Sequence, residues 1–345
     1  ELFLNESDLV IGRCPNHPTM EPIEIEEENY FFALSKYQEK LEEYLSHEGV
    51  IVPEWRRAEA LNFVKSGLED FSISRETKRM SWGIPVPGDD TQVMYVWFDA
   101  LVNYISTLDW PDGENFQKFW NDGETLQMAG KDQVRFQSVM WQAMLMSADV
   151  KTTNRVLYHG FITSGGQKMS KSLGNVISPF DLVERYGTDA TRYLLLRHVH
   201  PYEDTDVTVE RLDEWYNANL VNGLGNLVAR VMKMAETYGV TWKDYLGDDE
   251  NLHNYPGVWD KSWDTFDLKN VCDGLWGKVT ALDVYIQHEE PFKKIKTNPD
   301  EAKKDVAYLL SQLLRISFEL EPLLPNTAVL IRKAIQSNTK PDNLF

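Results

Sequence analysis

Two lysines three residues apart, Lys168 and Lys171, share a short loop with serines and glycines in the segment "GGQKMSKSLGN", residues 165–175. Glycines let such a loop move, and lysine ammonium groups bring positive charge to phosphate. The segment does not match the GxxxxGK[ST] pattern of P-loop proteins. Its composition also fits a solvated basic turn. A phosphate-binding role therefore depends on what the neighbouring elements place around it.

Strand-like and helical segments alternate on both sides of this loop. The strands expected are "QVMYVWF" (92–98), "LQMAG" (126–130) and "RVLYHGFIT" (155–163), and the first two lead into helical segments. This alternation is typical of a parallel α/β sheet. Ligands of such sheets bind at the carboxyl ends of strands, where residues 130–132 ("GKD") and His159 fall. The order of elements thus predicts a ligand site that includes the lysine loop.

Terminal signals bound two further helices. One is expected from Ser35 as its cap to Gly49 as its stop, and another has Ser178 as cap, Pro179 in its first position and Gly187 at its end. Beyond residue 205 strand signals cease, and long amphipathic stretches follow. A chain of 345 residues is long enough for two domains. We expect an α/β domain to precede a helical one, with the boundary near residue 205.

The composition limits the class of protein. No apolar run approaches the ~18 residues that a transmembrane helix needs, and the first residues lack the basic head of a signal peptide. Two cysteines cannot build a disulfide framework, which favours a reducing compartment, and we expect a cytoplasmic protein. The net charge of −19 disfavours non-specific nucleic-acid binding, although a local basic patch can still bind a nucleic acid.

The literal string "KMSKS" is the signature of class I aminoacyl-tRNA synthetases, and here "YHGF" precedes it and "LGN" follows it. Residues 95–104, "YVWFDALVNY", resemble the methionine-pocket segment of the methionyl enzymes, as does the stretch 82–87. The chain is identified as a member of that family. The resemblance implies the second half of a Rossmann-type catalytic domain followed by an all-α anticodon-binding helix bundle. Its expected parts are a connective-insertion remnant, the catalytic domain and the anticodon domain (1–30, 31–205 and 206–345).

The resemblance implies methionine–tRNA ligase activity with ATP and Mg²⁺. Methionine would become methionyl-adenylate and pass to tRNA(Met), with AMP and pyrophosphate released. Lys168 and Lys171 would stabilise the leaving pyrophosphate by positioning and charge, without a covalent enzyme intermediate. The full set implied on the ATP side is Gly130, Lys131, Asp132, His159, Lys168, Met169, Ser170, Lys171 and Ser172.

The methionine side chain would be wrapped by an aromatic group, which suits a thioether because sulfur–aromatic contacts are favourable by ~0.3–1.5 kcal/mol. The implied residues are Trp97, Ala100, Tyr104, Phe136 and Gln137. Gln137 stands where the family usually has His, and only His titrates near neutrality. Without the resemblance, the same aromatic residues would be read as an ordinary core.

The helical half carries a candidate reader of the CAU anticodon. Asn226 and Arg230 are four residues apart and share one helix face. Phe292 follows proline where the family usually has Trp, and a Phe ring can stack on a base at ~1–3 kcal/mol. Amide and guanidinium groups suit the edges of splayed bases. A solvated helix face would show the same spacing, so the resemblance carries this assignment.

Two features separate the chain from a complete enzyme of this family. Cys14 and His17 form a C-x2-H pair, half of a tetrahedral zinc site; we expect no zinc here, or a partial site, although the parent could hold zinc. The second class I signature, "HIGH", is not found in the sequence. We therefore expect a fragment that forms no methionyl-adenylate alone. The alternatives are a tRNA anticodon-binding module without ligase activity and an unrelated α/β nucleotide-binding protein.

Overall fold

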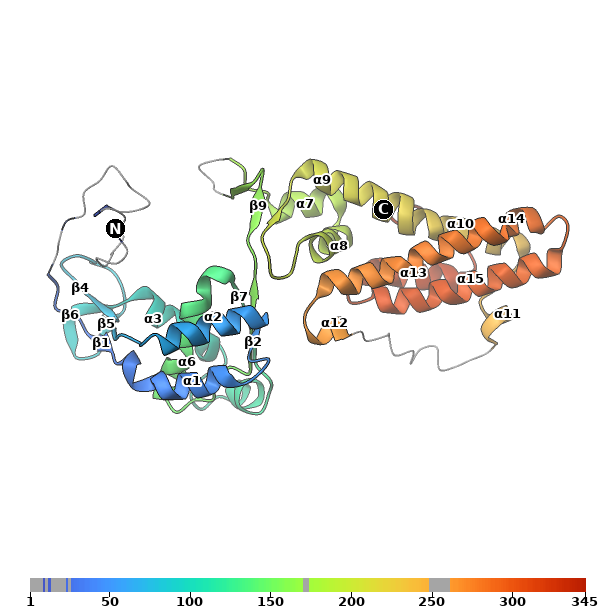
Figure 1. Ribbon diagram of the computed structural model, residues 1–345. Coiled ribbons are helices and arrows are strands. Elements are labelled where there is room, and N and C mark those ends of the chain that lie inside the picture. The colour runs from blue at the N-terminus through green and yellow to red at the C-terminus, as the bar shows by residue number, and fades with distance from the viewer. Residues whose placement is uncertain (1–8, 10–11, 14–22, 24–25, 170–173, 248–260) are drawn as a thin grey trace. The chain divides into compact units, whose positions relative to one another are not determined.

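The computed structural model describes residues 9, 12–13, 23, 26–169, 174–247 and 261–345 (Figure 1). The chain divides into two compact units, and its course passes between them more than once. The first unit comprises Glu1–Val50, Arg57–Leu126 and Arg135–Arg155, and the second comprises Ile51–Arg56, Gln127–Val134 and Val156–Phe345. The predicted boundary near residue 205 falls inside the second unit.

The first unit is built from short strands and helices. Its strands are β1 (Phe31–Phe32), β3 (Phe71–Ser72), β4 (Ser74–Glu76), β5 (Pro85–Val86) and β6 (Asp89–Met94). Its helices are η2 (Leu34–Tyr37), α1 (Gln38–Ser46), most of α2 (Glu54–Lys65), α3 (Val96–Leu101), α4 (Asn103–Ser106), α5 (Glu114–Phe116), η3 (Gln117–Asn121), η5 (Phe136–Met140) and α6 (Trp141–Ser147).

Two sequence predictions are wrong in this unit. The strand expected over 92–98 ends at Met94, and it pairs antiparallel with β4 and β5 instead of joining a parallel sheet. Gly88 takes a positive φ of 82° in the connection between β5 and β6, which lets the chain reverse there. Ser35 does not cap a helix: it lies inside η2, and its hydroxyl donates to Asp70 Oδ1 at 2.7 Å.

The core of the first unit is aromatic. Trp141 is buried on α6 and meets Trp120 of η3 edge-on, with ring centroids 6.2 Å apart. Leu101 and Ile105 reach the same core from α3 and α4. These helices carry the aromatic side chains expected at the methionine site, so the core fixes their placement.

The second unit starts with strands and continues as helices. Its strands are β2 (Ile51–Val52), β7 (Leu126–Gly130), β8 (Arg155–His159), β9 (Ile162–Ser164), β10 (Gln167–Lys168) and β11 (Thr205–Asp206). Its helices are η4 (Lys131–Gln133), α7 (Pro179–Tyr186), α8 (Thr188–His198), α9 (Val209–Trp215), η7 (Tyr216–Gly225), α10 (Asn226–Tyr238), α11 (Lys243–Leu246), α12 (Lys261–Asp264), α13 (Leu268–Glu289), α14 (Pro291–Lys294), α15 (Pro299–Leu320) and α16 (Pro325–Ser337).

Two three-stranded sheets position the candidate ATP side. One has the order β2–β8–β7, with β2 parallel to β8. The other has the order β10–β9–β11, in which β9 pairs antiparallel with β10 and parallel with β11. The strand expected over 155–163 is therefore two strands, β8 and β9. The break falls at Gly160, where the backbone of residues 203–204 approaches closely.

The helical part of this unit follows its sequence signals. Ser178 accepts the N–H of Phe180, Pro179 takes the first helical position, and Gly187 ends α7 with a φ of 79°, as predicted. The apolar stripes of α10, α13, α15 and α16 bury one continuous core. No helix in the described part of the chain has both the length and the apolar character needed to cross a membrane.

Candidate functional site

The carboxyl ends of β7 and β8 bring three predicted ATP-side residues together. Gly130 ends β7 and His159 ends β8. A methyl group at Gly130 would lie 2.7 Å from Asp132 Oδ1 and 3.9 Å from His159 Cε1, so the space between these side chains is kept open by glycine. His159 is exposed, and its Nδ1 lies 2.9 Å from the carbonyl oxygen of Gly160.

Lys131 is held beside this edge by an anion and an aromatic ring. Its Nζ lies 2.7 Å from Asp204 Oδ1 and 2.8 Å from Oδ2. The same ammonium lies 4.8 Å from the ring centroid of Phe161, whose N–H donates to Asp204 Oδ1. The Lys131 hydrogen bond, followed by that of Phe161, lowers the pKa of Asp204 below its usual value. Asp204 is thus a carboxylate at neutral pH and orients Lys131.

The hairpin of β9 and β10 carries Lys168 to the same ring. Gly165 and Gly166 take φ values of 63° and 73° in the two-residue turn, which suits a left-handed turn pair. Asp206 Oδ1 accepts the N–H of Gly166 at 2.7 Å and the hydroxyl of Thr163 at 3.2 Å. Lys168 Nζ then lies 5.2 Å from the ring centroid of Phe161.

The described part of the lysine loop therefore begins on the β9–β10 hairpin, whose turn is formed by Gly165 and Gly166. Lys168 is exposed and Met169 half-buried at the start of the loop. Ser170, Lys171 and Ser172 lie outside the described residues, so their predicted roles stay predictions. Two ammonium groups beside one ring at the carboxyl ends of strands can bind a polyphosphate anion.

In the first unit, the residues predicted to hold methionine also come together. Trp97 of α3 lies against Phe136 of η5, with centroids 4.9 Å apart and planes tilted by 33°. Ala100 is one helical turn beyond Trp97, and Gln137 Nε2 donates to the hydroxyl of Tyr104 at 2.8 Å. Trp97 is 36% exposed, so this group is not a closed core. A surface-open aromatic group with a polar corner suits a small amphipathic ligand.

Gln137 fills the polar corner with an amide. It is only 4% exposed, and its Oε1 is a buried acceptor without a hydrogen bond among the described residues; Trp141 Nε1 is a buried donor in the same condition. The backbone carbonyl of Gln137 accepts Gln142 Nε2 at 2.9 Å, and Gln142 also pairs with Thr153. The side chain that stands where the family usually has His is therefore buried with one hydrogen bond, to the Tyr104 hydroxyl, and an amide does not titrate near neutrality.

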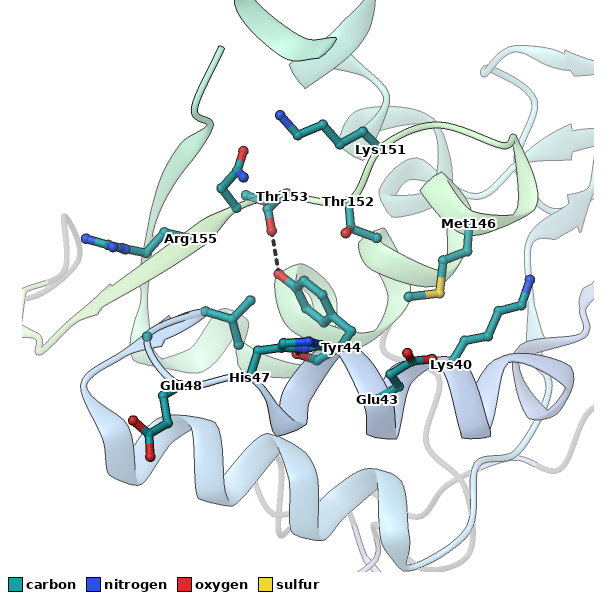
Figure 2. Close-up of a pocket in the computed structure, with 13 residues that line it drawn as sticks. Lys40, Glu43, Tyr44, His47, Glu48, Met146, Lys151, Thr152, Thr153 and Arg155 are labelled. Atoms are coloured by element: carbon teal, nitrogen blue, oxygen red, sulfur yellow. Dashed lines mark hydrogen bonds between the residues drawn. The ribbon is translucent and has the colours of Figure 1, made fainter. Parts of the chain in front are cut away.

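The hydrogen bonds that run from Gln137 through Gln142 end at Thr153, which lines a cavity of about 580 Å³. None of the predicted site residues lines this cavity. Figure 2 shows it between α1, which supplies Lys40, Glu43 and Tyr44, and the segment before β8. The hydroxyl of Tyr44 donates to the carbonyl of Thr153 at 2.9 Å, the bond drawn in Figure 2. Cations and glutamates both line this cavity, and the chemistry assigned above does not use it.

The predicted anticodon residues lie in the helical part of the second unit. Arg230 of α10 pairs with Asp283 of α13, with NH1 and Oδ1 2.7 Å apart. Arg230 and Phe292 line one cavity of about 530 Å³, and the Phe292 side chain is 43% exposed. Asn226 is exposed at the start of α10, one turn before Arg230, and does not line the cavity.

The short helix that bears Phe292 is fixed by ion pairs. Lys294 Nζ lies 2.7 Å from Asp305 Oδ2 and 2.7 Å from Glu289 Oε2, and Asp305 is only 5% exposed. These hydrogen bonds, Asp305 first, raise the pKa of Lys294 above its usual value. The phenyl ring is thus presented to solvent from a rigid support.

Cys14 and His17 lie outside the described residues, so the predicted half zinc site stays a prediction. Within the ranges that the structure describes, no three His, Cys, Asp or Glu side chains gather into a group able to hold a metal ion. Cys272 is buried in the helical core, and this burial raises the pKa of its thiol to about 12.

Comparison with known proteins shows the family of the chain. The family model described as "tRNA synthetases class I (M)" matches residues 4–232. The chain belongs to this family. The methionine–tRNA ligase of a Nostoc species is 39% identical over 343 residues, which cover 94% of this chain and 64% of that protein. The Synechocystis enzyme is 38% identical over 348 residues, covering 96% and 65% respectively.

Solved structures also place the chain among the methionyl enzymes. The Mycobacterium tuberculosis methionyl-tRNA synthetase in complex with methionyl-adenylate matches with a TM-score of 0.76 at 32% identity, over 89% of this chain and 62% of that one. The predicted family and the predicted class of fold, a Rossmann-type α/β part followed by a helical part, are both confirmed. The chain spans somewhat less than two thirds of the length of these relatives.

Several residues beside the candidate sites were not predicted from sequence. Asp204 and Phe161 organise the lysines, and Asp283 holds Arg230. Asp204 lies 73 residues from its lysine partner, and Asp283 lies 53 residues from Arg230. No spacing pattern marks contacts at such distances in the chain. Phe161 is different, because it is the last residue of the "YHGF" string that supports the family resemblance. The sequence therefore contained a signal for this residue.

Proposed function

We propose that this chain carries the lysine loop, part of the methionine site and the anticodon reader of a methionine–tRNA ligase. Family membership supports the reaction type. The observation that carries the local assignment is the convergence of Lys131 and Lys168 on Phe161, beside the carboxyl ends of β7 and β8. The proposed reaction uses ATP and tRNA, and we assign it to the cytoplasm.

The proposed chemistry has two steps. A carboxylate oxygen of methionine attacks the α-phosphorus of ATP, the bond to the bridging oxygen breaks, and pyrophosphate leaves with the electron pair. A ribose hydroxyl at the end of tRNA(Met) then attacks the carbonyl carbon, and AMP leaves. Lys168 and Lys171 stabilise the charge that builds on the pyrophosphate in the first step. Gly130, Asp132 and His159 form the floor on which the nucleotide lies.

Mg²⁺ accompanies ATP in this proposal, held mainly by the phosphates. Methionine occupies the group of Trp97, Ala100, Tyr104, Phe136 and Gln137. The Trp97 and Phe136 rings supply the apolar surface, and the amide of Gln137 fixes the hydroxyl of Tyr104. Because this amide carries no titrating proton, methionine binding is expected to be independent of any ionisation at position 137.

The lysine assignment is tested by methionine-dependent ATP–pyrophosphate exchange, measured in a form of the protein that makes methionyl-adenylate. Lys168→Ala and Lys171→Ala should each slow adenylate formation by roughly 2.7–4 kcal/mol in activation free energy. Methionine binding should hold, because the aromatic group is untouched. An unchanged exchange rate in both variants would refute the role of the loop.

We also propose that the 345-residue chain alone forms no methionyl-adenylate, since it spans under two thirds of its relatives and contains no "HIGH" string. Exchange activity of this chain would contradict that statement. The second candidate, a tRNA-binding module without ligase activity, draws its support from the helical part. There α10, α13, α15 and α16 share one core, and Arg230 of α10 and Phe292 of α14 line one cavity.

Reading of the CAU anticodon is the third part of the proposal. Arg230 and Asn226 supply hydrogen-bond donors and acceptors to base edges, and Phe292 supplies a stacking surface. Phe has a smaller face than the Trp usual in the family and lacks its N–H. The stacking contribution is therefore expected at the lower end of ~1–3 kcal/mol per base.

A further inference from the structure

The cavity beside Phe292 has an apolar floor and a cationic rim. Met234 and Ile286 are buried beneath it, at 9% and 0% exposure, and Ala229 completes the apolar part. Every charged residue that lines the cavity in the described part of the chain is a cation: Arg230, Lys233 and Lys340. In a chain of net charge −19, such a concentration of positive charge is a local feature of this surface.

The three cations are not equivalent. Arg230 is engaged by Asp283 at 2.7 Å, which fixes its guanidinium and offsets its charge. Lys233 makes only a 3.6 Å contact with Glu236 on an exposed helix face. Lys340 is exposed and has no ion pair among the described residues. Lys233 and Lys340 therefore retain charge that is available to an incoming anion, whereas Arg230 is better suited to directional hydrogen bonds.

Local structure holds Lys340 at the cavity. Helix α16 ends where Asn338 takes a left-handed conformation, with a φ of 47°, and the N–H of Thr339 donates back to the carbonyl of Ala334 at 3.1 Å. On the other side of Lys340, Phe345 packs edge-on against Tyr216, with centroids 6.4 Å apart. The segment is anchored before and after Lys340, so this lysine belongs to a defined surface.

We propose that Lys233 and Lys340 bind the two phosphodiester groups on either side of the nucleotide whose base enters this cavity against Phe292. The ligand is single-stranded RNA, because an apolar floor and an exposed ring accept an unstacked base while the two ammonium groups meet its backbone. This inference rests on the proposed anticodon reading. It adds backbone contacts that carry no base information, one from Lys233 on the same helix as Asn226 and Arg230, and one from Lys340 beyond the end of α16.

The test measures binding of a CAU anticodon stem-loop and of a scrambled loop to the 345-residue chain. Binding is monitored by fluorescence anisotropy at several salt concentrations. The variants are Lys233→Ala, Lys340→Ala and Lys340→Arg, and the matched control is Lys65→Ala, an exposed lysine at the end of α2. A lost single-strand phosphate contact lowers the slope of log K against log salt by ~0.7, which corresponds to about fivefold weaker binding at 0.1 M salt.

Lys233→Ala and Lys340→Ala should each show that loss of slope and affinity for both loops alike. The ratio of CAU to scrambled affinity should stay as in the wild type. Lys65→Ala should keep the wild-type slope. Lys340→Arg should restore the slope. Slopes for the two alanine variants equal to that of Lys65→Ala would overturn the phosphate assignment. A wild-type ratio of one would instead remove the proposed base readout, so the two failures are distinguishable.

Discussion

The ammonium groups of Lys131 and Lys168 both lie against the ring of Phe161, with Nζ atoms 4.8 and 5.2 Å from its centroid. One lysine follows β7 and the other ends β10, so a single aromatic side chain joins the "GKD" segment to the start of the lysine loop. An aromatic face attracts cations without neutralising them. The ring can thus hold two like charges near each other; Asp204 offsets the charge of Lys131, and the exposed Lys168 is the one left available to phosphate.

Replacing Phe161 by leucine should separate these charges. Leucine keeps the apolar volume but removes the ring quadrupole, which is worth about 0.5–1 kcal/mol per cation at exposed sites. We expect methionine-dependent ATP–pyrophosphate exchange in an active form of the protein to slow about two- to tenfold, with KM for ATP raised. Phe161→Tyr serves as the control because it retains the ring. Equal rates for leucine and wild type would mean that the ring does not organise the lysines.

Gly160 is required by a close approach of the chain. A methyl group there would lie 2.2 Å from the backbone carbonyl of Glu203, next to the Asp204 that anchors Lys131. Gly160→Ala should destabilise the second unit by about 1–3 kcal/mol, as overpacking does, and should lower exchange activity. Gly274→Ala is the matched control: that helical position has open space and should gain about 0.5–1 kcal/mol. Urea unfolding of both variants measures the difference, and a stability of Gly160→Ala equal to wild type would contradict the steric argument.

Local signals were readable in the sequence and distant contacts were not. The cap at Ser178, the proline after it and the stop at Gly187 act within one helix, so their pattern predicted α7 correctly. Trp97 was expected on a strand but lies on a helix. The high β-propensity of residues 92–98 does not reveal that pairing with β4 and β5 ends at Met94. The site residues came from family resemblance, while the pairing of Arg230 with Asp283 depends on packing between helices.

The ion pair of Arg230 with Asp283 allows base reading to be separated from charge in a test of the anticodon prediction. Arg230→Ala should weaken binding of the CAU stem-loop by about 1–3 kcal/mol and relax its preference over a scrambled loop. The variant also leaves Asp283 as an unpaired negative charge near RNA, which alone weakens binding to any loop. The double variant Arg230→Ala/Asp283→Asn removes that repulsion, and it should recover part of the affinity but none of the preference. A preference for CAU in the double variant as strong as that of the wild type would show that Arg230 does not read bases.

His198 predicts how stability depends on pH. Its ring stacks on Trp215, with centroids 4.2 Å apart and planes 5° apart. Burial, and secondarily the charge of Arg197, lowers the pKa of His198 to about 4. As pH falls from about 6.5 to about 4, the unfolded chain takes up a proton that the folded chain excludes, so stability decreases across this window by at most about 3 kcal/mol.

His198→Phe keeps a ring on Trp215 and removes the titrating group. The Asn219 amide, which contacts His198, keeps the Trp215 carbonyl as an acceptor at 2.9 Å. Urea unfolding at pH 7 and pH 4.5 should show a smaller loss of unfolding free energy for this variant than for the wild type. Identical losses in the two proteins would assign the acid sensitivity to other groups.

We propose that this chain reads a methionine anticodon, and the most direct test is RNA binding by the unmodified chain. Fluorescence anisotropy with a CAU stem-loop and a scrambled loop, at a low and a high salt concentration, separates base readout from charge. A preference for CAU that persists at the higher salt is predicted, because contacts to base edges release few counterions. Equal, salt-sensitive binding to both loops would contradict anticodon reading by Asn226, Arg230 and Phe292.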